Sequence, residues 1–513
     1  MLLTATIYSC NKDDTLGPPS SLTELIDDIK LESRDTAITL RWRKALTAWE
    51  GDTEPTVRYE VNVSSDPEFE DESQQVLALE TDSPFVSLNQ QQLVPLQEYY
   101  ARVRSIAGPN NARSNWLESK VFMILDEVPE VPVLKPVKAQ EITDEVAIVH
   151  WGDADEYTIT HLVLTADGQE GEEIQLSGDE LSDRAKTIEG LTSNQAYTVQ
   201  LFAGERSMGT QTFATKPSID DLDAVVDLRG SSGSDALLQA VNTAAEGSTI
   251  VLSRGSVHTI SSMLLLERSV TIMSEPGFDA PARLDFSGGG WMDIADGSTI
   301  DHIVLNEIEV IGDVESTYVM NVGNGTNVGR IVLENCLVTN HRGTIRIKNS
   351  NPVLIDEIAI NNSLIQHIGG YGVVNVDNNA ATVNNVRLTN STVNNAQLIL
   401  RSRTDGQSIT IENVTFYNAP FEGYLIDYNG VSISATIRNS LFGLTSSANA
   451  VRADGSPLRE VENSFATSDF DGDMASRIEV YSKASRDVFS APDDGDFTII
   501  DDDLSMLGDP RWR

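Results

Sequence analysis

One short phrase recurs through the second half of the chain and limits what that half can fold into. It is a run of alternating apolar residues that ends in asparagine and then, in most copies, a small residue, and successive asparagines lie 23 to 28 residues apart. The copies place them at Asn335, Asn362, Asn390, Asn413, Asn439 and Asn463, with a weaker copy upstream at Asn306. A period of this size built from short strands predicts a solenoid with one coil per repeat.

These asparagines are expected to be structural. Asparagine tolerates a left-handed backbone at the end of a strand, and identical amides in stacked coils can form a hydrogen-bonded ladder. Cys336 stands where most other copies have a small serine, so we expect a buried thiol there. The repeat therefore describes a scaffold, and functional residues must be sought elsewhere in each coil.

The second strand of each coil, 10 to 15 residues past the asparagine, carries charged side chains that alternate with apolar ones. The apolar residues must face the core, so a period of two sends the polar residues outward, and stacked coils lie about 4.8 Å apart. The residues predicted to line one continuous, substrate-binding face are Arg346, Lys348, Asn375, Asp377, Arg401, Arg403, Asp427, Tyr428, Arg452 and Asp454.

The arginines of this face are an exception in an acidic chain. The 513 residues carry a formal net charge of −42, which argues against nucleic acid and against a basic membrane patch. A long polar face suits a polymer, and an anionic polymer would have to bind at a local basic strip. The two cysteines, Cys10 and Cys336, lie in such different contexts that we expect no disulfide between them.

A helix-forming segment precedes the solenoid. Apolar residues recur at helical spacing over residues 235–247 and a glycine ends the run. This segment and the strands after it resemble the capping helix and first coil of the pectate-lyase-like right-handed β-helix superfamily. The resemblance implies a right-handed parallel β-helix over residues 217–513.

Two similar all-β segments come first, over residues 20–125 and 126–216. Each has a tryptophan strand, ending at Trp42 or Trp151, and a later leucine–turn–tyrosine strand around Tyr100 or Tyr197. This layout resembles fibronectin type III domains, which are two-sheet sandwiches. We expect these four aromatic residues in the cores, and the modules to act as spacers.

Residues 1–19 are expected to be a signal remnant and linker. A short apolar stretch ends at Cys10, and an acidic pair follows at Asp13 and Asp14. This resembles a lipoprotein signal of Bacteroidetes, with Cys10 lipidated. The ending, residues 496–512, resembles the close of β-helix lipoproteins from polysaccharide-utilisation loci. The resemblance implies a lipid-anchored protein at the cell surface, in the outer membrane, with a polysaccharide and a glycan transporter complex as partners.

Three functions are open for the predicted face: a lyase, binding without catalysis, and a glycosidase that would use two carboxylates among Asp377, Asp427 and Asp454. In a β-eliminating polysaccharide lyase, Lys348 would remove the proton next to a uronate carboxylate that Arg401 and Arg403 neutralise. No cofactor is required, but Asp377 and Asp427 offer oxygen ligands for Ca²⁺. A binding protein would use the same face without catalysis.

Further candidates lie beside the face. His341, Arg342, His367 and Tyr371 fall in turns at its rim, and one coil is unusually aromatic, with Tyr417, Phe421, Tyr424 and Tyr428. The leading prediction is capture of an extracellular, acidic polysaccharide. The alternatives are a lyase and an adhesin or structural stalk.

Overall fold

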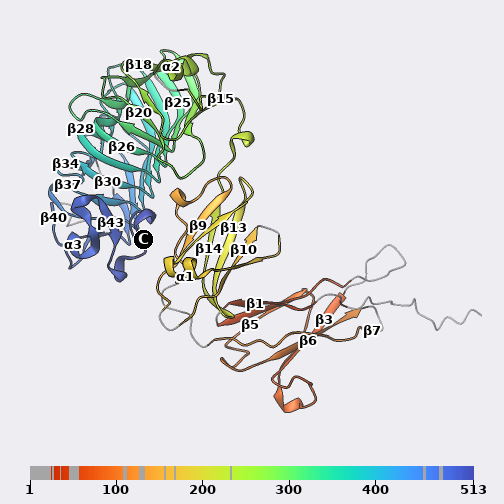
Figure 1. Cartoon of the computed structure of the whole chain (residues 1–513). Coiled ribbons are helices and arrows are strands. Elements are labelled where there is room, and N and C mark those ends of the chain that lie inside the picture. The colour runs from red at the N-terminus through yellow and green to blue at the C-terminus, as the bar shows by residue number, and fades with distance from the viewer. Residues whose placement is uncertain are drawn as a thin grey trace, which may run out of the picture.

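The computed structural model places two β-sandwiches before a long solenoid (Figure 1). Cys10 and the rest of residues 1–24 lie outside the described residues, so the lipidation prediction gains no structural account. The structure describes residues 25, 28–34, 36–45, 57–107, 112–125, 133–154, 157–166, 169–231, 234–454, 458–472 and 478–513.

The first sandwich packs a three-stranded sheet against a five-stranded one. Trp42 and Tyr59 meet edge to face inside it, with ring centroids 5.3 Å apart. The sheets are, in order, β1 (Lys30–Arg34), β2 (Ala37–Arg41) and β5 (Phe85–Asn89); and β4 (Gln75–Thr81), β3 (Val57–Ser64), β6 (Tyr100–Ala107) and β7 (Ala112–Arg113), with β8 (Leu117–Glu118) paired to β6.

The second sandwich repeats this plan with fewer strands. Trp151 and Tyr197 lie in its core, as predicted. Its sheets are β12 (Ala185–Glu189) with β9 (Val146–His150); and β11 (Glu172–Gln175), β10 (His161–Ala166), β13 (Ala196–Ala203) and β14 (Arg206–Ala214), with the short helix α1 (Gly178–Asp183) between β11 and β12.

The tyrosine strand of the first sandwich differs by one residue from the prediction, whereas that of the second agrees with it. In the second sandwich the Tyr197 hydroxyl accepts a hydrogen bond from the Thr192 backbone N–H at 2.8 Å. In the first, Tyr99 is fully buried and receives the equivalent bond from Val94 at 2.9 Å. The prediction that Tyr100 is the core tyrosine is wrong, because adjacent strand residues face opposite sides and Tyr99 takes the inner one.

Two long parallel sheets build the solenoid, which confirms the predicted parallel β-helix architecture. The first sheet has ten strands: β15 (Val225–Asp227), β16 (Ser248–Leu252), β19 (Val270–Ser274), β22 (Ser298–Asn306), β25 (Thr326–Glu334), β27 (Val353–Asn361), β29 (Ala381–Thr389), β32 (Ser408–Glu412), β35 (Ser434–Arg438) and β38 (Leu458–Glu462).

The second sheet carries two strand segments in most coils, because the chain bends midway. Its strands are β17 (Val257–Thr259), β18 (Met263–Leu266), β20 (Ala282–Asp285), β21 (Trp291–Ile294), β23 (Ile308–Ile311), β24 (Tyr318–Val322), β26 (Leu337–Ile347), β28 (Leu364–Val376), β30 (Thr392–Ala396), β31 (Leu400–Ser402), β33 (Thr415–Tyr417), β34 (Gly423–Tyr428), β36 (Leu441–Phe442), β37 (Thr445–Ala453), β39 (Phe465–Ala466), β40 (Phe470–Gly472) and β41 (Glu479–Val480).

The recurring asparagines mark the corner between the two sheets. All six adopt a left-handed backbone, with φ between 45° and 54°. The Asn413 amide donates to Asn390 at 3.0 Å and the Asn463 amide to Asn439 at 2.9 Å. The predicted ladder is therefore present at these two steps, whereas the Asn362 amide donates to Glu334 and the Asn390 amide donates to Asn361. We call these six residues the asparagine column.

A second ladder runs just inside the first. The backbone N–H groups of Cys336 and Ser363 donate to the serine hydroxyl one coil further on, at Ser363 and Ser391, each at 3.0 Å. Cys336 is buried, as predicted, and burial raises the pKa of its thiol to about 12. Each small residue thus satisfies a backbone group of its neighbour, which explains why the position after the asparagine stays small.

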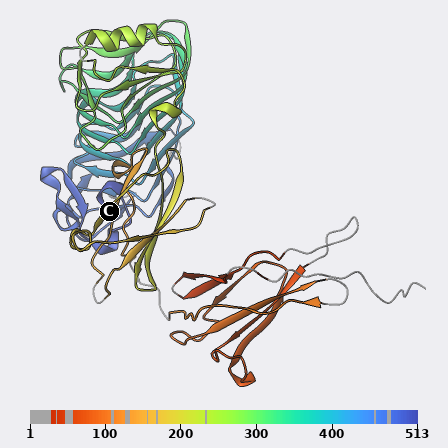
Figure 2. The same ribbon diagram turned by 45° about the vertical axis from the view of Figure 1, so that its right-hand side comes forward.

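Both ends of the solenoid are covered. Helix α2 (Ser234–Thr243) lies across the first coils and buries Leu237 against the core (Figure 2). At the other end, α3 (Ser485–Val488) and the hairpin of β42 (Phe489–Ala491) and β43 (Asp496–Ile499) form a small apolar cluster with Tyr417 and Leu441. The predicted capping helix is present.

The last residues of the chain, 507–513, run back along the side of the solenoid, and we call them the C-terminal strap. Trp512 donates to the Thr392 hydroxyl at 2.7 Å, and Arg513 donates to the Asn413 amide oxygen at 3.0 Å. Further bonds join Arg511 to the Asn362 carbonyl at 2.6 Å and Gly508 to the Asn439 carbonyl at 2.8 Å. The strap is thereby bonded to four successive coils.

A buried ion cluster joins the second sandwich to the solenoid. Glu307, whose side chain is 9% exposed, pairs with Lys216 at 2.5 Å and also with Arg254. Lys216 follows the last strand of the sandwich, whereas Glu307 and Arg254 belong to early coils.

Candidate functional site

The predicted face exists as one row of paired residues on the second sheet. Strand pairing aligns Arg346 with Asn375, Asn375 with Arg401, Arg401 with Asp427, and Asp427 with Arg452. Successive members therefore lie one coil apart, or about 4.8 Å. A neighbouring row follows two residues later in each coil and contains Lys348, Asp377 and Arg403, because their preceding residues Ile347, Val376 and Ser402 are paired.

Each aspartate in these rows is held between two arginines. The Asp377 carboxylate accepts hydrogen bonds from Arg346 at 2.6 Å and from Arg403 at 2.7 Å. Asp427 receives Arg401 at 3.0 Å and Arg452 at 2.8 and 2.9 Å. We call these four arginines and two aspartates the arginine strip.

The charge of the strip is set by these pairs. Burial alone would raise the pKa of both carboxyl groups, but the arginine hydrogen bonds outweigh it and hold the pKa of Asp377 and of Asp427 below its ordinary value. Both aspartates are therefore ionised at neutral pH. Four arginines against two carboxylates leave an excess of positive charge on a strongly acidic chain.

Solvent reaches three of the four arginines of the strip, whereas Arg346 is only 19% exposed, like its partner Asp377. The Arg403 side chain is 58% exposed and that of Arg452 is 42% exposed, whereas only 4% of Asp427 is exposed. A ligand that approaches the strip would meet guanidinium groups, and the carboxylates beneath would hold them in place.

Two residues predicted on this face are buried. Asn375 lies between Arg346 and Arg401 in the row and is 1% exposed. Tyr428 is 2% exposed and belongs to the hydrophobic core, because Asp427 takes the outward position in that strand. The prediction that these two residues contact a ligand is wrong. Asp454, near the end of the row, is exposed as predicted.

The calcium prediction does not fit the geometry. Asp377 and Asp427 are each occupied by two guanidinium groups, which would repel a cation. In the part of the chain that the structure describes, no group of three or more His, Cys, Asp or Glu side chains could hold a metal ion.

Lys348, the predicted catalytic base, lies apart from the arginines assigned to neutralise the substrate. Its ammonium nitrogen lies 5.4 Å from the centre of the Trp291 ring, near the buried Asp293. Asp377 lies between Lys348 and Arg403 in their row, which separates the lysine and the arginine by two coils, or about 10 Å.

A groove opens beside the strip, where the second sheet bends. It has a volume of about 570 Å³ and is lined mainly by polar side chains. Arg342, His367 and Tyr371, predicted as rim residues, all line it, whereas His341 is fully buried, and burial lowers its pKa to about 4. Glu315 and Gln397 were not predicted, because no repeat in the sequence places them beside Phe421; the run Gly369-Gly370 was the available signal.

Tyr371 forms the wall between the groove and the strip. The guanidinium of Arg342 lies 4.7 Å from the centre of the Tyr371 ring, and that of Arg346 lies 4.3 Å from it. Tyr318 packs against the same ring edge to face, with centroids 5.6 Å apart. One tyrosine thus positions a cation of the groove and a cation of the strip.

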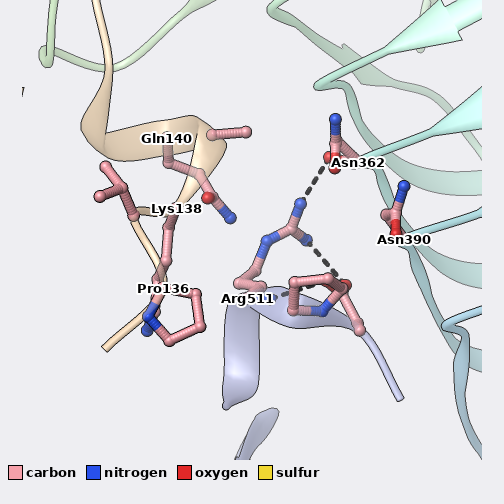
Figure 3. A pocket seen from close by; sticks show the side chains of 10 residues that line it. Pro136, Lys138, Gln140, Asn362, Asn390 and Arg511 are labelled. Atoms are coloured by element: carbon pink, nitrogen blue, oxygen red, sulfur yellow. Dashed lines mark hydrogen bonds and ion pairs between the residues drawn. The ribbon is translucent and has the colours of Figure 1, made fainter. Parts of the chain in front are cut away.

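A smaller pocket, of about 260 Å³, lies between the second sandwich and the solenoid (Figure 3). Pro136, Lys138 and Gln140 face Asn362 and Asn390 across it. The guanidinium of Arg511, between the two sides, is already bonded to the Asn362 carbonyl and lies 3.7 Å from Asp509. These contacts mark the pocket as part of the joint between the domains.

Comparisons with known proteins give families without an assigned function. Two family models match the solenoid: Domain of unknown function (DUF4957) over residues 256–396 and Domain of unknown function (DUF5123) over residues 409–512. No curated protein matches this chain.

Solved structures similar to the chain contain fibronectin type III domains or a receptor chain. They are the FN1–FN3 domains of chicken CNTN1 (16% identity, TM-score 0.20, 38% of this chain and 66% of that one) and a two-domain fibronectin type III segment of chicken tenascin (16%, 0.14, 38% and 99%). The third is the chicken interferon gamma receptor alpha chain (14%, 0.17, 39% and 98%). At these identities the likeness concerns the fold alone. None of the described helices is long and apolar enough to cross a membrane.

Proposed function

We propose that this protein binds an extracellular, acidic polysaccharide along the arginine strip of its solenoid. The observation that carries the proposal is the spacing of cations. Arg346, Arg401 and Arg452 recur in every second coil of one row, and Arg403 adds a cation in the row beside it. A polymer that carries a carboxylate on its repeating unit presents charge at regular intervals, as the strip does.

The surroundings of the strip favour an anionic ligand over a neutral one. The chain as a whole has a net charge of −42, so an anion is repelled from most of its surface. Paired aspartates fix the arginines without neutralising them fully, and guanidinium groups bind carboxylates in a two-pronged geometry. An aromatic ring lies at each end of the strip. The Arg346 guanidinium lies 4.3 Å from the centre of the Tyr371 ring, and the Arg452 guanidinium lies 4.4 Å from the centre of the Tyr424 ring.

The remaining domains are assigned a supporting role in this proposal. A lipid on Cys10 would anchor the chain to the outer membrane, and the two sandwiches would hold the solenoid away from the surface. Delivery of the bound glycan to a transporter complex then follows from the cell-surface setting implied by the signal-like N-terminus.

Affinity electrophoresis tests the proposal. The protein is run in gels that contain polygalacturonate, alginate, hyaluronan or neutral dextran, at low and high salt. Retardation by an acidic polymer, weakened by salt and absent with dextran, is the expected result. Equal mobility in all gels would overturn binding and favour the structural stalk.

The same polymers test the lyase alternative. β-Elimination leaves an unsaturated product, so its absorbance is followed with and without added Ca²⁺. Product that disappears in Lys348→Ala would replace the binding proposal with catalysis. Retardation without any product supports a binding protein.

A further inference from the structure

We infer that the groove beside the strip is a separate subsite that binds one or two uronate units of the polysaccharide. The inference rests on the proposed function and adds a recognition site to it. The strip attracts the negative charges along the polymer, whereas the groove binds the ring and the carboxylate of individual sugars.

The groove has the size and lining of a saccharide site. Its volume of about 570 Å³ lies within the range of small-ligand pockets, about 300–1,000 Å³. Residues from four coils and from the loop before β24 line it. Gly370 leaves room for the Gln397 side chain, because a Cβ atom there would lie 3.1 Å from the Gln397 amide oxygen.

Arg342 supplies the group that would bind a carboxylate. It is exposed, it lines the groove, and it forms no ion pair with any residue that the structure describes. This separates it from the four arginines of the strip, each of which has an aspartate partner. The Tyr371 ring holds its guanidinium, so less conformational entropy is lost on binding than for a free arginine.

The opposite side of the groove offers groups for the rest of a sugar ring. Phe421 is half-buried and lines the groove, where it can pack against the apolar face of a sugar. Gln397, Asn395 and Glu315 bring amide and carboxylate groups for hydroxyls. The Gln397 amide nitrogen already donates to Glu422 at 3.2 Å, which orients its oxygen.

The test uses short oligosaccharides, which carry far fewer charges than the polymer and so depend less on the strip. Isothermal titration measures the binding of the trisaccharides of galacturonate and mannuronate and of a hyaluronan tetrasaccharide, together with the carboxyl-reduced form of each. At least one acidic probe should bind, and its carboxyl-reduced or neutral counterpart should bind at least tenfold more weakly. Failure of all three acidic probes would overturn the inference.

Matched variants assign the binding to the groove. Arg342→Gln should weaken the best trisaccharide about 10- to 100-fold, since a charge-assisted contact is lost. Arg387→Gln makes the same change on the ten-stranded sheet, where the exposed arginine lies 3.8 Å from Glu357, and should have no effect. Phe421→Ala should weaken both acidic and carboxyl-reduced probes.

The outcomes separate the two proposals. Normal retention of the polymer with unchanged oligosaccharide binding in Arg342→Gln would refute the groove subsite and leave the strip standing. Oligosaccharide binding that depends on Arg342, together with polymer retention that does not change when the strip arginines are substituted, would support the groove subsite and refute binding along the strip. Thermal denaturation of each variant checks that the fold is intact.

Discussion

The asparagine column and the arginine strip follow the same coils, but they differ in kind. The column repeats one residue type, and its members bond to the backbone and to one another. The row that carries the strip alternates arginine with amide and carboxylate, and the side chains of Arg401, Arg403 and Arg452 are 39% to 58% exposed. Exact repetition therefore marks the scaffold of this solenoid, and departure from repetition marks its candidate binding surface.

The largest expected effect comes from breaking the column. Asn390→Val removes amide bonds to Asn361 and from Asn413 and places a β-branched residue at φ 48°. Two lost hydrogen bonds cost about 1 kcal/mol each, and the left-handed backbone costs about 1–2 kcal/mol more. We expect unfolding free energy to fall by about 3–4 kcal/mol in denaturant titration.

Asn390→Gly is the control for this change, since glycine accepts the left-handed backbone. The free energy of unfolding of this variant should fall by only about 2 kcal/mol, for the two lost hydrogen bonds. Equal losses for the glycine and valine variants would show that backbone conformation is not what selects asparagine. Neither variant should alter polymer affinity per folded molecule.

A substitution in the strip should lower polymer affinity and leave the stability of the fold nearly unchanged. Arg401→Ala should lower polymer affinity about tenfold, or about 1.4 kcal/mol, while Arg387→Ala on the other sheet leaves it unchanged. Asp427 keeps Arg452 as partner, so the stability of Arg401→Ala should change by less than about 1 kcal/mol. Affinity electrophoresis and thermal denaturation measure the two effects, and unchanged affinity would show that the strip is not the binding face.

Lowering the pH should weaken the ion pairs of the strip and leave the hydrogen bonds of the asparagine column unchanged. The pKa values of Asp377 and Asp427 are lowered in the folded state, so the unfolded chain takes up their protons first as pH falls. Their contribution to the free energy of unfolding is therefore complete at neutral pH. It is lost as the pH falls from about 5 through the pKa values of the folded state. Asp377→Asn/Asp427→Asn should show a flatter stability curve below pH 5 than the parent, whereas parallel curves would contradict the pairing.

The smallest effect is expected from making the inner ladder uniform. Cys336→Ser installs the residue found in most other coils, and the Ser363 hydroxyl still accepts its backbone N–H. Stability should change by less than about 1 kcal/mol. Because burial raises the pKa of the thiol, Cys336 in the parent should react with iodoacetamide only when the protein unfolds. Rapid labelling of the native protein at this residue would contradict its burial.

The repeat length made the solenoid predictable, along with the asparagine ladder and the row of charged residues. All of these depend on periodicity along the chain, and periodicity survives as register in parallel strands. Arg346, Arg401, Asp427 and Arg452 were accordingly placed in the correct row.

The rest depends on contacts that periodicity does not encode. Asn375 was predicted outward and does occupy the outward row between Arg346 and Arg401, but its side chain is only 1% exposed. Tyr428 shares a strand with Asp427, and only one of two adjacent residues can face outward. The groove joins residues from separate turns at a bend in the sheet, and the arginine–aspartate pairs that exclude calcium link side chains about 25 to 31 residues apart.

The C-terminal strap has a consequence for how the solenoid comes apart. In a stacked array each repeat contacts only its neighbours, so the terminal coils of such a protein can fray one at a time. Here the final residues are bonded to four coils that begin up to about 150 positions earlier in the chain. Those coils cannot open singly without releasing the strap, so this end of the molecule is built to unfold as a single cooperative block.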